Sequence, residues 1–316
     1  MSSDELDRAV RAVVRDCLGV GDGEEVLVIA NPATDGLGRA LRDEAQDAGG
    51  EAVLTVMAER ASHAGEPPRT IAEAMAAADV VLAPTVQSLS HTAARKRASE
   101  AGARIATLPG VTEEMLARVM SADMAELRRR GDAIAERLDA ASEAVIKCPN
   151  GSDLHLDLSG RTAIPDAGVL TERGAFGNLP CGEGFIPPAN GYGTLVIDGS
   201  LAGIGLAEEP VELVVEGGHL TSARGGQGMQ FMALLTEHGE DGTNVAELGI
   251  GSNEKAILTG NVLEDEKILG TAHVAFGASA AIGGNVQVPV HLDCVVMKPT
   301  VELDGEPLVR EGELLV

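Results

Sequence analysis

The sequence predicts an α/β N-terminal domain with a mainly parallel sheet over residues 1–147, followed by a β-rich α+β C-terminal domain over residues 148–316. Short apolar segments alternate with amphipathic ones as far as residue 145, a pattern typical of a parallel sheet with helices on its faces. Beyond the CPNG segment at residues 148–151, the chain is rich in glycine and alternates with a period of two, which favours antiparallel strands. The domain boundary is therefore predicted at this change of pattern.

The elements of the first half follow in order along the chain. Ser3-Asp4 can cap a first helix, in which apolar residues recur at helical spacing as far as Leu18. The later helices are predicted at residues 36–48, 71–78, 91–101 and 122–145, and the strands at residues 25–30, 52–56, 80–83 and 104–107. The helix at 122–145 is expected to lead out of the first domain.

The second half contains predicted strands at residues 153–158, 194–197, 211–216 and 286–296. In the last of these, NVQVPVHLDCVV, the apolar residues fall on one face, and His291 and Asp293 fall on the other. An imidazole and a carboxylate held on one face suit metal ligation. A solvated strand face or a His–Asp hydrogen bond explains the same pattern, so these alternatives stay open for this segment alone.

Three more residues are candidates for the same chemistry. His273, in GTAHVAFG, has small neighbours on its own strand face, which leaves room for a metal or a substrate. Glu247 lies on the polar side of the AELGIG strand, and Glu183 is flanked by glycines and followed by a double proline. A structural histidine and surface glutamates are the alternatives. Two histidines with one to three carboxylates fit a mononuclear facial triad or a two-metal hydrolytic site.

The charge balance excludes several classes of partner. The chain has 49 Asp and Glu against 24 Lys and Arg, a formal net charge of -25, and only five lysines. Such a surface repels phosphate backbones and anionic lipids, so neither nucleic acid nor a membrane is expected as a partner. It suits a protein that stays soluble in high salt, which predicts a halophilic source.

Other features predict a cytoplasmic protein. The four cysteines are scattered and form no C-x-x-C pair, so no disulfide framework is expected. The first ten residues are acidic and amphipathic, unlike a signal peptide, and no apolar run is long enough to span a membrane. The acidic residues 264–266 are interpreted as a solvated turn, with extra metal ligands as the alternative.

A family resemblance covers roughly residues 151–296. The segments NLPCGEGFIPP, GTLVIDGS, AELGIG, GTAHVAFG and VPVHLD resemble, in order and spacing, the aminopeptidase T family of metallo-aminopeptidases. In the first half, SLSHTAARKRA followed by GARIATLPGVTEEML resembles the same superfamily. The resemblance implies a homodimeric hydrolase that removes the N-terminal residue of a short peptide, using a metal-activated water in its C-terminal domain. It implies two zinc or cobalt ions, and the implied ligands are Glu183, Glu247, His273, His291 and Asp293.

One position departs from the aminopeptidase pattern. Members of that family carry a tyrosine seven residues after the first ligand histidine, where this chain has Ala280. The only tyrosine is Tyr192. If the family tyrosine stabilises the oxyanion, its donor is missing here, which weakens the peptidase interpretation more than it weakens metal binding.

The same scaffold is similar to that of 2,5-dihydroxypyridine 5,6-dioxygenase. This resemblance implies a single Fe(II) on His273, His291 and Asp293, opening of an aromatic small-molecule substrate by O₂, and His91 as a base. Glu183 and His91 are thus the predicted catalytic residues. The three basic residues 95–97 either anchor a substrate carboxylate or form a solvated helix face, which is the favoured interpretation. A third hypothesis is a metal-binding protein of this fold without peptidase activity.

Overall fold

The computed structural model describes residues 3–316, which divide by their contacts into two compact units. The first unit comprises the chain up to residue 122 together with residues 168–181, and the second comprises residues 123–167 and 182–316. The units therefore interleave along the sequence and do not follow the predicted division after residue 147.

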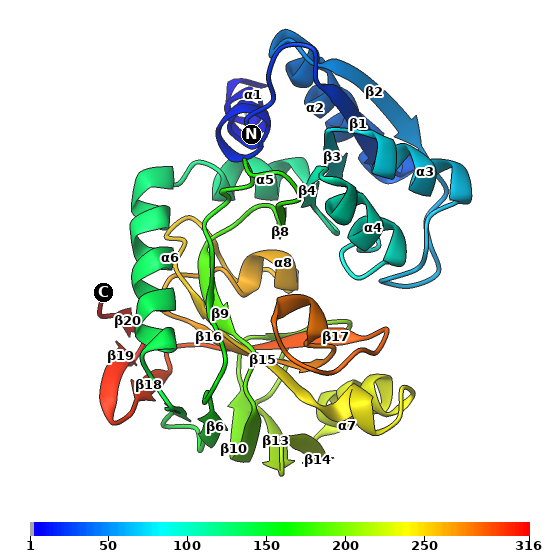
Figure 1. Cartoon of the computed structure of the whole chain (residues 1–316). Helices are drawn as coiled ribbons and strands as arrows, with labels where there is room; N and C mark the ends of the chain where they lie inside the picture. The colour runs from blue at the N-terminus through cyan, green and yellow to red at the C-terminus, as the bar shows by residue number, and fades with distance from the viewer. Residues whose placement is uncertain (1–2) are drawn as a thin grey trace. The chain divides into compact units, whose positions relative to one another are not determined.

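The first unit contains a five-stranded sheet in which every pairing is parallel, in the order β2-β1-β3-β4-β8 (Figure 1). The strands are β1 (Glu25–Ala30), β2 (Glu51–Val56), β3 (Val80–Ala83), β4 (Arg104–Thr107) and β8 (Phe176–Asn178). The predicted parallel sheet is confirmed. Its fifth strand was not predicted, because β8 is only three residues long and arrives from the distant segment 168–181.

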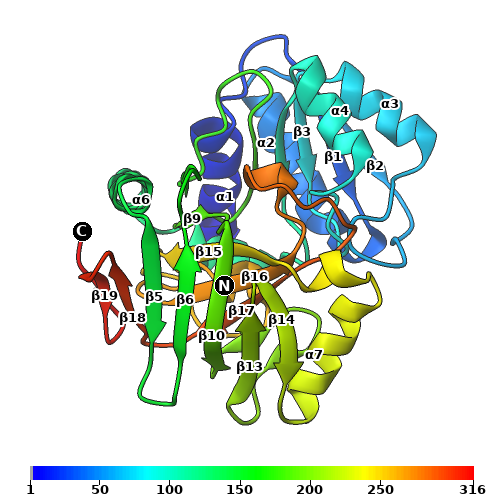
Figure 2. The same ribbon diagram turned by 60° about the horizontal axis from the view of Figure 1, so that its bottom comes forward.

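Helices cover both faces of this sheet (Figure 2). They are α1 (Ser3–Arg11), the π-helical segment η1 (Ala12–Cys17), η2 (Pro32–Thr34), α2 (Asp35–Asp47), α3 (Arg69–Ala77), α4 (Ala93–Ala101) and α5 (Glu113–Val119). Alternate strand residues, such as Leu27, Ile29 and Val81, pack against α3 and α4 in one apolar cluster. A period of two in the strands and of 3.6 in the helices is what brings these apolar faces together.

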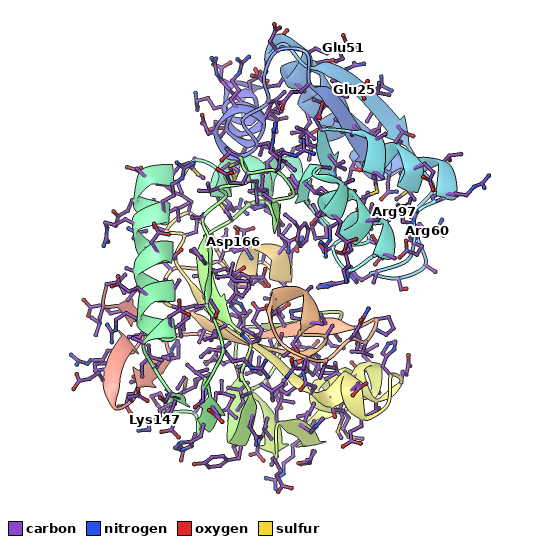
Figure 3. All side chains as sticks on the ribbon, viewed as in Figure 1. Glu25, Glu51, Arg60, Arg97, Lys147 and Asp166 are labelled. Carbon is purple, nitrogen blue, oxygen red and sulfur yellow. The ribbon has the colours of Figure 1, made fainter. Side chains whose placement is uncertain are left out.

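The two edges of the parallel sheet differ in chemistry. At the amino ends of β1 and β2, Glu25 and Glu51 are register partners (Figure 3). At the carboxyl ends lie neutral polar residues, Asn31 after β1, Thr107 at the end of β4 and Asn178 at the end of β8. Asn31 and Thr107 are buried, so this edge carries a buried polar network.

The second unit contains two antiparallel sheets. The eight-stranded sheet has the order β14-β13-β10-β6-β5-β18-β19-β20, and the seven-stranded sheet has the order β12-β11-β17-β16-β15-β9-β7. The strands of the first are β5 (Glu143–Lys147), β6 (Asp153–Asp157), β10 (Asn190–Ile197), β13 (Val211–Glu216), β14 (His219–Ala223), β18 (Thr300–Leu303), β19 (Glu306–Arg310) and β20 (Glu313–Leu314). Those of the second are β7 (Ile164–Asp166), β9 (Glu183–Ile186), β11 (Ser200–Leu201), β12 (Gly205–Leu206), β15 (Val245–Gly251), β16 (Ala272–Gly277) and β17 (His291–Val296).

The helical segments of this unit are α6 (Met124–Asp139), α7 (Gly226–Thr236), η3 (Glu240–Thr243), α8 (Val262–Asp265) and η4 (Ala280–Ile282). The helix predicted to reach residue 145 is too long by six residues, because α6 ends at Asp139. The following segment forms β5, in which Ala144 and Ile146 are buried and pair with β6 and β18. Tertiary burial of this apolar segment outweighs its helical continuation. None of the helices in residues 3–316 combines the length and apolar character that a membrane span requires.

One apolar core lies between the two sheets of this unit, and it places the candidate site. Ile146 and Leu154 of the eight-stranded sheet belong to the same cluster as Val274 and Cys294 of the seven-stranded sheet. Because strand side chains alternate, the neighbours of Val274 and Cys294 point away from this core. The strand predicted from residue 286 begins only at His291, and the carbonyl groups of Val286 and Val290 accept hydrogen bonds from the loop at residues 278–280.

Candidate metal centre

Adjacent strands of the seven-stranded sheet carry the five predicted ligands on the face opposite the apolar core. Glu183 begins β9, Glu247 lies in β15, His273 in β16, and His291 and Asp293 in β17. These four strands are consecutive in the sheet order. The register therefore gathers residues that lie up to 110 positions apart (183 to 293) into one patch.

The distances between the donor atoms suit chelation of an ion. His273 Nε2 lies 2.9 Å from Glu183 Oε2 and 3.3 Å from Glu247 Oε1. His291 Nε2 lies 3.4 Å from Glu247 Oε2 and 3.7 Å from Asp293 Oδ1. Ligand atoms about 2.1 Å from a common ion are themselves roughly 3.0–3.5 Å apart, so these side chains need only small movements to bind one.

Three overlapping groups in the described chain offer donor atoms within 4.8 Å of one another. The first is Glu183, Glu247 and His273, the second is Glu247, His291 and Asp293, and the third is Glu266, His273 and Asp293. The structure thus brings together all five residues predicted as ligands. It adds Glu266, which the sequence analysis gave as a ligand only in the alternative interpretation of residues 264–266.

The acidic segment around Glu266 is buried, so the interpretation of residues 264–266 as a solvated turn is wrong. Glu264 accepts a hydrogen bond from the backbone of Ile257, and Asp265 accepts two from Thr259 and Gly260. These bonds fold the loop at residues 257–260 over α8 and exclude water from it. A run of acidic residues gives no sign of this in the sequence, because the donors are backbone groups of another loop.

Lys267 is a residue of the cluster that the sequence did not single out. Its side chain is completely buried, and its Nζ donates to Glu183 Oε1 at 2.6 Å and to a carboxylate oxygen of Glu266. The available signal was a lysine in a lysine-poor chain, followed by the apolar residues Ile268 and Leu269. The structure makes this ammonium an integral part of the cluster.

Gly249 makes the position of His273 possible. The two residues are register partners on β15 and β16, and a Cβ built on Gly249 would lie 2.0 Å from His273 Nε2. The imidazole therefore lies directly over the glycine, in space that any other side chain would fill. The glycine in AELGIG acts here through close approach rather than through an unusual backbone angle.

Both histidines direct Nε2 to the cluster. His291 Nδ1 lies 2.7 Å from the carbonyl oxygen of Ala278, which is an acceptor only, so Nδ1 carries the proton and Nε2 faces Glu247 and Asp293. Histidines that bind metals are commonly oriented by such a second hydrogen bond. His273 directs its Nε2 to Glu183 and Glu247.

The electrostatics of the cluster favour cations. Burial acts to lower the pKa of His273, but the neighbouring carboxylates, Glu183 first, outweigh it and hold that pKa well above its ordinary value. The pKa of His291 is likewise raised, against burial, by Asp293 and Glu247. The pKa of Glu266 is raised to about 8, chiefly by burial, which Lys267 opposes and Asp293 and Glu183 reinforce. With both imidazoles neutral, as metal binding requires, the carboxylates outnumber the one ammonium, and a bound cation would balance their charge in place of the histidine protons.

His91, the predicted base, belongs to the first unit. It is exposed in the turn before α4, whose N-cap is Thr92. Its catalytic role stays a prediction. Of the basic residues that follow, Arg95 is buried with its guanidinium 4.1 Å from the centre of the Phe176 ring, so the predicted solvated face is wrong for this residue. The other two, Lys96 and Arg97, are exposed as expected.

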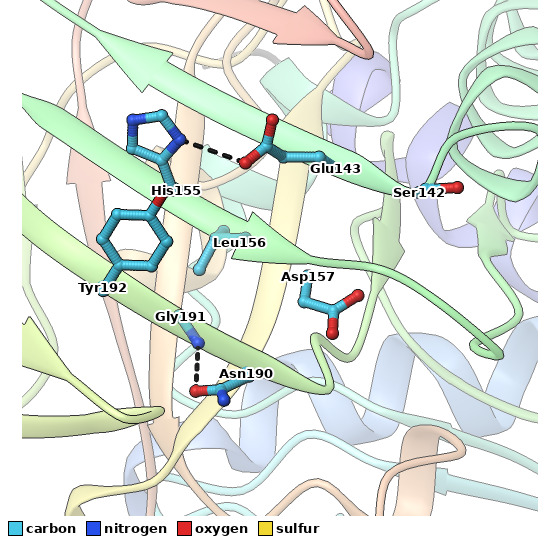
Figure 4. Close-up of a pocket in the computed structure, with 8 residues that line it drawn as sticks. All are labelled: Ser142, Glu143, His155, Leu156, Asp157, Asn190, Gly191 and Tyr192. Carbon is cyan, nitrogen blue, oxygen red and sulfur yellow. Dashed lines mark hydrogen bonds and ion pairs between the residues drawn. The ribbon is translucent and has the colours of Figure 1, made fainter.

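The aminopeptidase tyrosine has no counterpart in this cluster. Ala280, at the equivalent position, is exposed at the start of η4. Tyr192 lies on the eight-stranded sheet, stacked on His155 with ring centroids 4.8 Å apart. Figure 4 shows both rings at a surface pocket whose lining residues include none of the candidate ligands.

The fold and the cluster define a class: an α/β protein whose antiparallel second unit carries a candidate metal centre. A family model described as NicX, 2,5-dihydroxypyridine 5,6-dioxygenase, matches residues 8–316, and the chain belongs to this family. A search of curated protein sequences finds no match.

Two solved structures have the same fold. The 2,5-dihydroxypyridine dioxygenase from Pseudomonas putida KT2440 is 21% identical, with a TM-score of 0.87 over 100% of this chain and 98% of the other. AmpT from Thermus thermophilus is 22% identical, with a TM-score of 0.73 over 99% of each chain. At such identities the likeness concerns the fold.

Proposed function

We propose that this protein is a mononuclear Fe(II) dioxygenase that opens the ring of a dihydroxypyridine-type substrate. The observation that carries this proposal is the overlap of three donor groups, which between them contain His273, His291 and Asp293, within a chain of the dihydroxypyridine dioxygenase family. Two histidines and one carboxylate with open positions are the ligand set of many non-haem Fe(II) oxygenases. The family match thus favours the second of the two enzymatic hypotheses drawn from the sequence.

The residues of this chain fit such an ion. The carbonyl of Ala278 fixes the tautomer of His291, so that Nε2 is available as a ligand. Glu247 lies between the two imidazoles and holds both ring nitrogens toward the same space. Bound Fe(II) would supply the O₂ chemistry that no side chain provides. The buried carboxylates would neutralise its charge in a site with little water.

The experiment is a metal count joined to two activity assays. Protein purified anaerobically in high salt is analysed for iron, zinc, cobalt and manganese, and its O₂ uptake is measured with 2,5-dihydroxypyridine. One iron per chain with substrate-dependent O₂ uptake supports the proposal. Fully iron-loaded protein that consumes no O₂ with this or related dihydroxypyridines would refute it.

Peptide hydrolysis is the second candidate, and a specific observation supports it. Glu183, Glu247 and His273 form a second carboxylate-rich group next to the triad, and the fold matches AmpT. The exposed Ala280, in the place of the family tyrosine, counts against it. Two zinc or cobalt ions per chain, with release of p-nitroaniline from an aminoacyl substrate, would favour this hydrolase.

The ligand assignment has its own test. His291→Ala and Asp293→Ala should each lose the metal and stay folded, because both side chains point away from the core. His155→Ala is the matched control, since His155 lies at the pocket of the other sheet. If both cluster variants keep stoichiometric metal, the proposed ligand set is wrong.

A further inference from the structure

The buried lysine of the cluster is exceptional within this chain. The four other lysines are all exposed: Lys96, Lys147, Lys255 and Lys298. Lys267 is instead 0% exposed and lies between two buried carboxylates. A buried ammonium is costly unless it is paired, so its place here requires the carboxylates that surround it.

The contacts of Lys267 distinguish the three candidate metal groups. Its ammonium binds Glu183, a member of the first group, and Glu266, a member of the third. It thus engages a carboxylate of each of these groups and leaves the second group, Glu247, His291 and Asp293, complete. His273 adjoins that second group through Glu247.

A second divalent ion would conflict with this ammonium. An ion bound through Glu183 or Glu266 would share a carboxylate with Lys267, and two cations around one carboxylate repel each other strongly in a buried site. An ion at the second group shares no carboxylate with the lysine. The arrangement therefore accommodates one divalent ion beside one fixed positive charge.

We propose that Lys267 takes the place of a second metal ion and restricts this cluster to a single divalent ion. This inference rests on the proposed function, because it assumes that the cluster binds metal. Lys267 is a positioning residue: it holds Glu183 and Glu266 by hydrogen bonds and makes the first and third groups unavailable to a metal. Removing the ammonium frees the carboxylates of Glu183 and Glu266, which can then bind a second ion beside the first.

The test is the number of ions in Lys267→Met, which keeps the length of the side chain and removes its charge. Apo-protein is reconstituted anaerobically with Mn(II) and dialysed, and the metal per chain is counted. Electron paramagnetic resonance separates an isolated Mn(II) from a spin-coupled pair. One isolated ion is expected in the wild type and in the exposed-site control Lys147→Met, and a coupled pair in Lys267→Met.

The outcomes separate the two proposals. A folded Lys267→Met that still binds one ion overturns the role of Lys267 and leaves the proposed function intact. A wild type that binds two ions overturns the role of the lysine and favours the hydrolase. A wild type that binds none overturns the metal-dependent function itself.

A second variant guards against misfolding of Lys267→Met, in which two carboxylates lose their partner. Lys267→Met/Glu183→Gln/Glu266→Gln replaces both carboxylates by neutral amides, so it should fold and bind a single ion. Circular dichroism checks the fold of each variant. A folded triple variant with a coupled pair of ions would contradict the proposal, because its first and third groups then each lack a carboxylate.

Discussion

Two regions of this molecule gather polar side chains from distant parts of the chain. They differ in how the hydrogen bonds and charges of these side chains are satisfied. At the carboxyl edge of the parallel sheet, Ser88, Ser90, Thr107 and Asn178 form a neutral network. Ser90 Oγ lies 2.8 Å from both Ser88 Oγ and Thr107 Oγ1, and Thr107 donates to Asn178 Oδ1 at 2.6 Å. In the metal cluster, by contrast, nearly every member is ionisable.

The two regions differ in whether a bound cation is needed to balance their charge. Hydroxyl groups both donate and accept, so the neutral network satisfies its own hydrogen bonds. The cluster contains four carboxylates and one ammonium, and its two imidazoles must be neutral to bind a metal. Unbalanced buried charge costs far more than neutral polar groups that are paired. We therefore expect the neutral network to be complete in the protein alone, and the cluster to be complete only with a cation.

The largest expected effect follows from metal removal. An ion present at about 1,000 times its dissociation constant adds about 4 kcal/mol to the free energy of unfolding of the unit that binds it. Chelation should lower the thermal unfolding temperature, followed by circular dichroism because the chain has no tryptophan. Hydrogen exchange should accelerate in β15, β16 and β17 and stay unchanged in β1 and β3. Equal acceleration of hydrogen exchange in both sheets would contradict the expectation that the metal stabilises only the unit that binds it.

A smaller effect is expected from Gly249→Ala. The new methyl group would overlap the His273 ring, so the imidazole must move away from Glu183 and Glu247. Overpacking of this kind costs about 1–3 kcal/mol, and we expect at least a tenfold weaker metal affinity, measured by titration. Gly226→Ala is the control, because a Cβ there meets open space. Unchanged metal affinity in Gly249→Ala would show that His273 is not a ligand.

Thr107→Val tests the neutral network, and its expected loss of stability is smaller. The change keeps the shape of the side chain but removes the hydroxyl that joins Ser90 to Asn178. The free energy of unfolding should fall by about 1–2 kcal/mol, measured with urea, while metal content stays the same. Thr70→Val, at an exposed position of α3, should have little effect. Metal loss in Thr107→Val would contradict the independence of the two regions.

Local patterns predicted the parts of the fold that depend on local sequence. The strands β1 and β3 and the polar face of β17 follow from apolar segments and a period of two, so the positions of His291 and Asp293 were predictable. The strand β8 was not predictable, because Phe176–Asn178 pairs with β4 only after a long excursion of the chain. Lys267 was missed, and Glu266 was kept only as an alternative ligand, for a related reason: Lys267 is paired with Glu183, which is 84 positions away in the sequence.

The smallest effect is expected from the ion pair between Glu24 and Arg104, whose opposite charges neutralise each other. Two hydrogen bonds, of 2.9 and 2.7 Å, join the guanidinium to the carboxylate, and they hold the pKa of Glu24 below its usual 4.5 despite partial burial. A lowered pKa means that the folded state favours the charged form, so this stability is fully present above pH 4.5 and is lost as pH falls through the folded pKa.

Glu24→Gln should therefore lower the free energy of unfolding at pH 7 by about 0.5–1 kcal/mol, because the pair is partly exposed. The difference from the wild type should shrink as urea titrations move below pH 4.5. Glu114→Gln is the matched control, since its pair with Arg118 leaves the carboxylate side chain 79% exposed and should contribute almost nothing. A Glu24→Gln deficit that grows in acid would mean that the carboxylate is stabilised in its protonated form. This pair would then resemble Glu266 of the metal cluster, whose pKa is raised by burial.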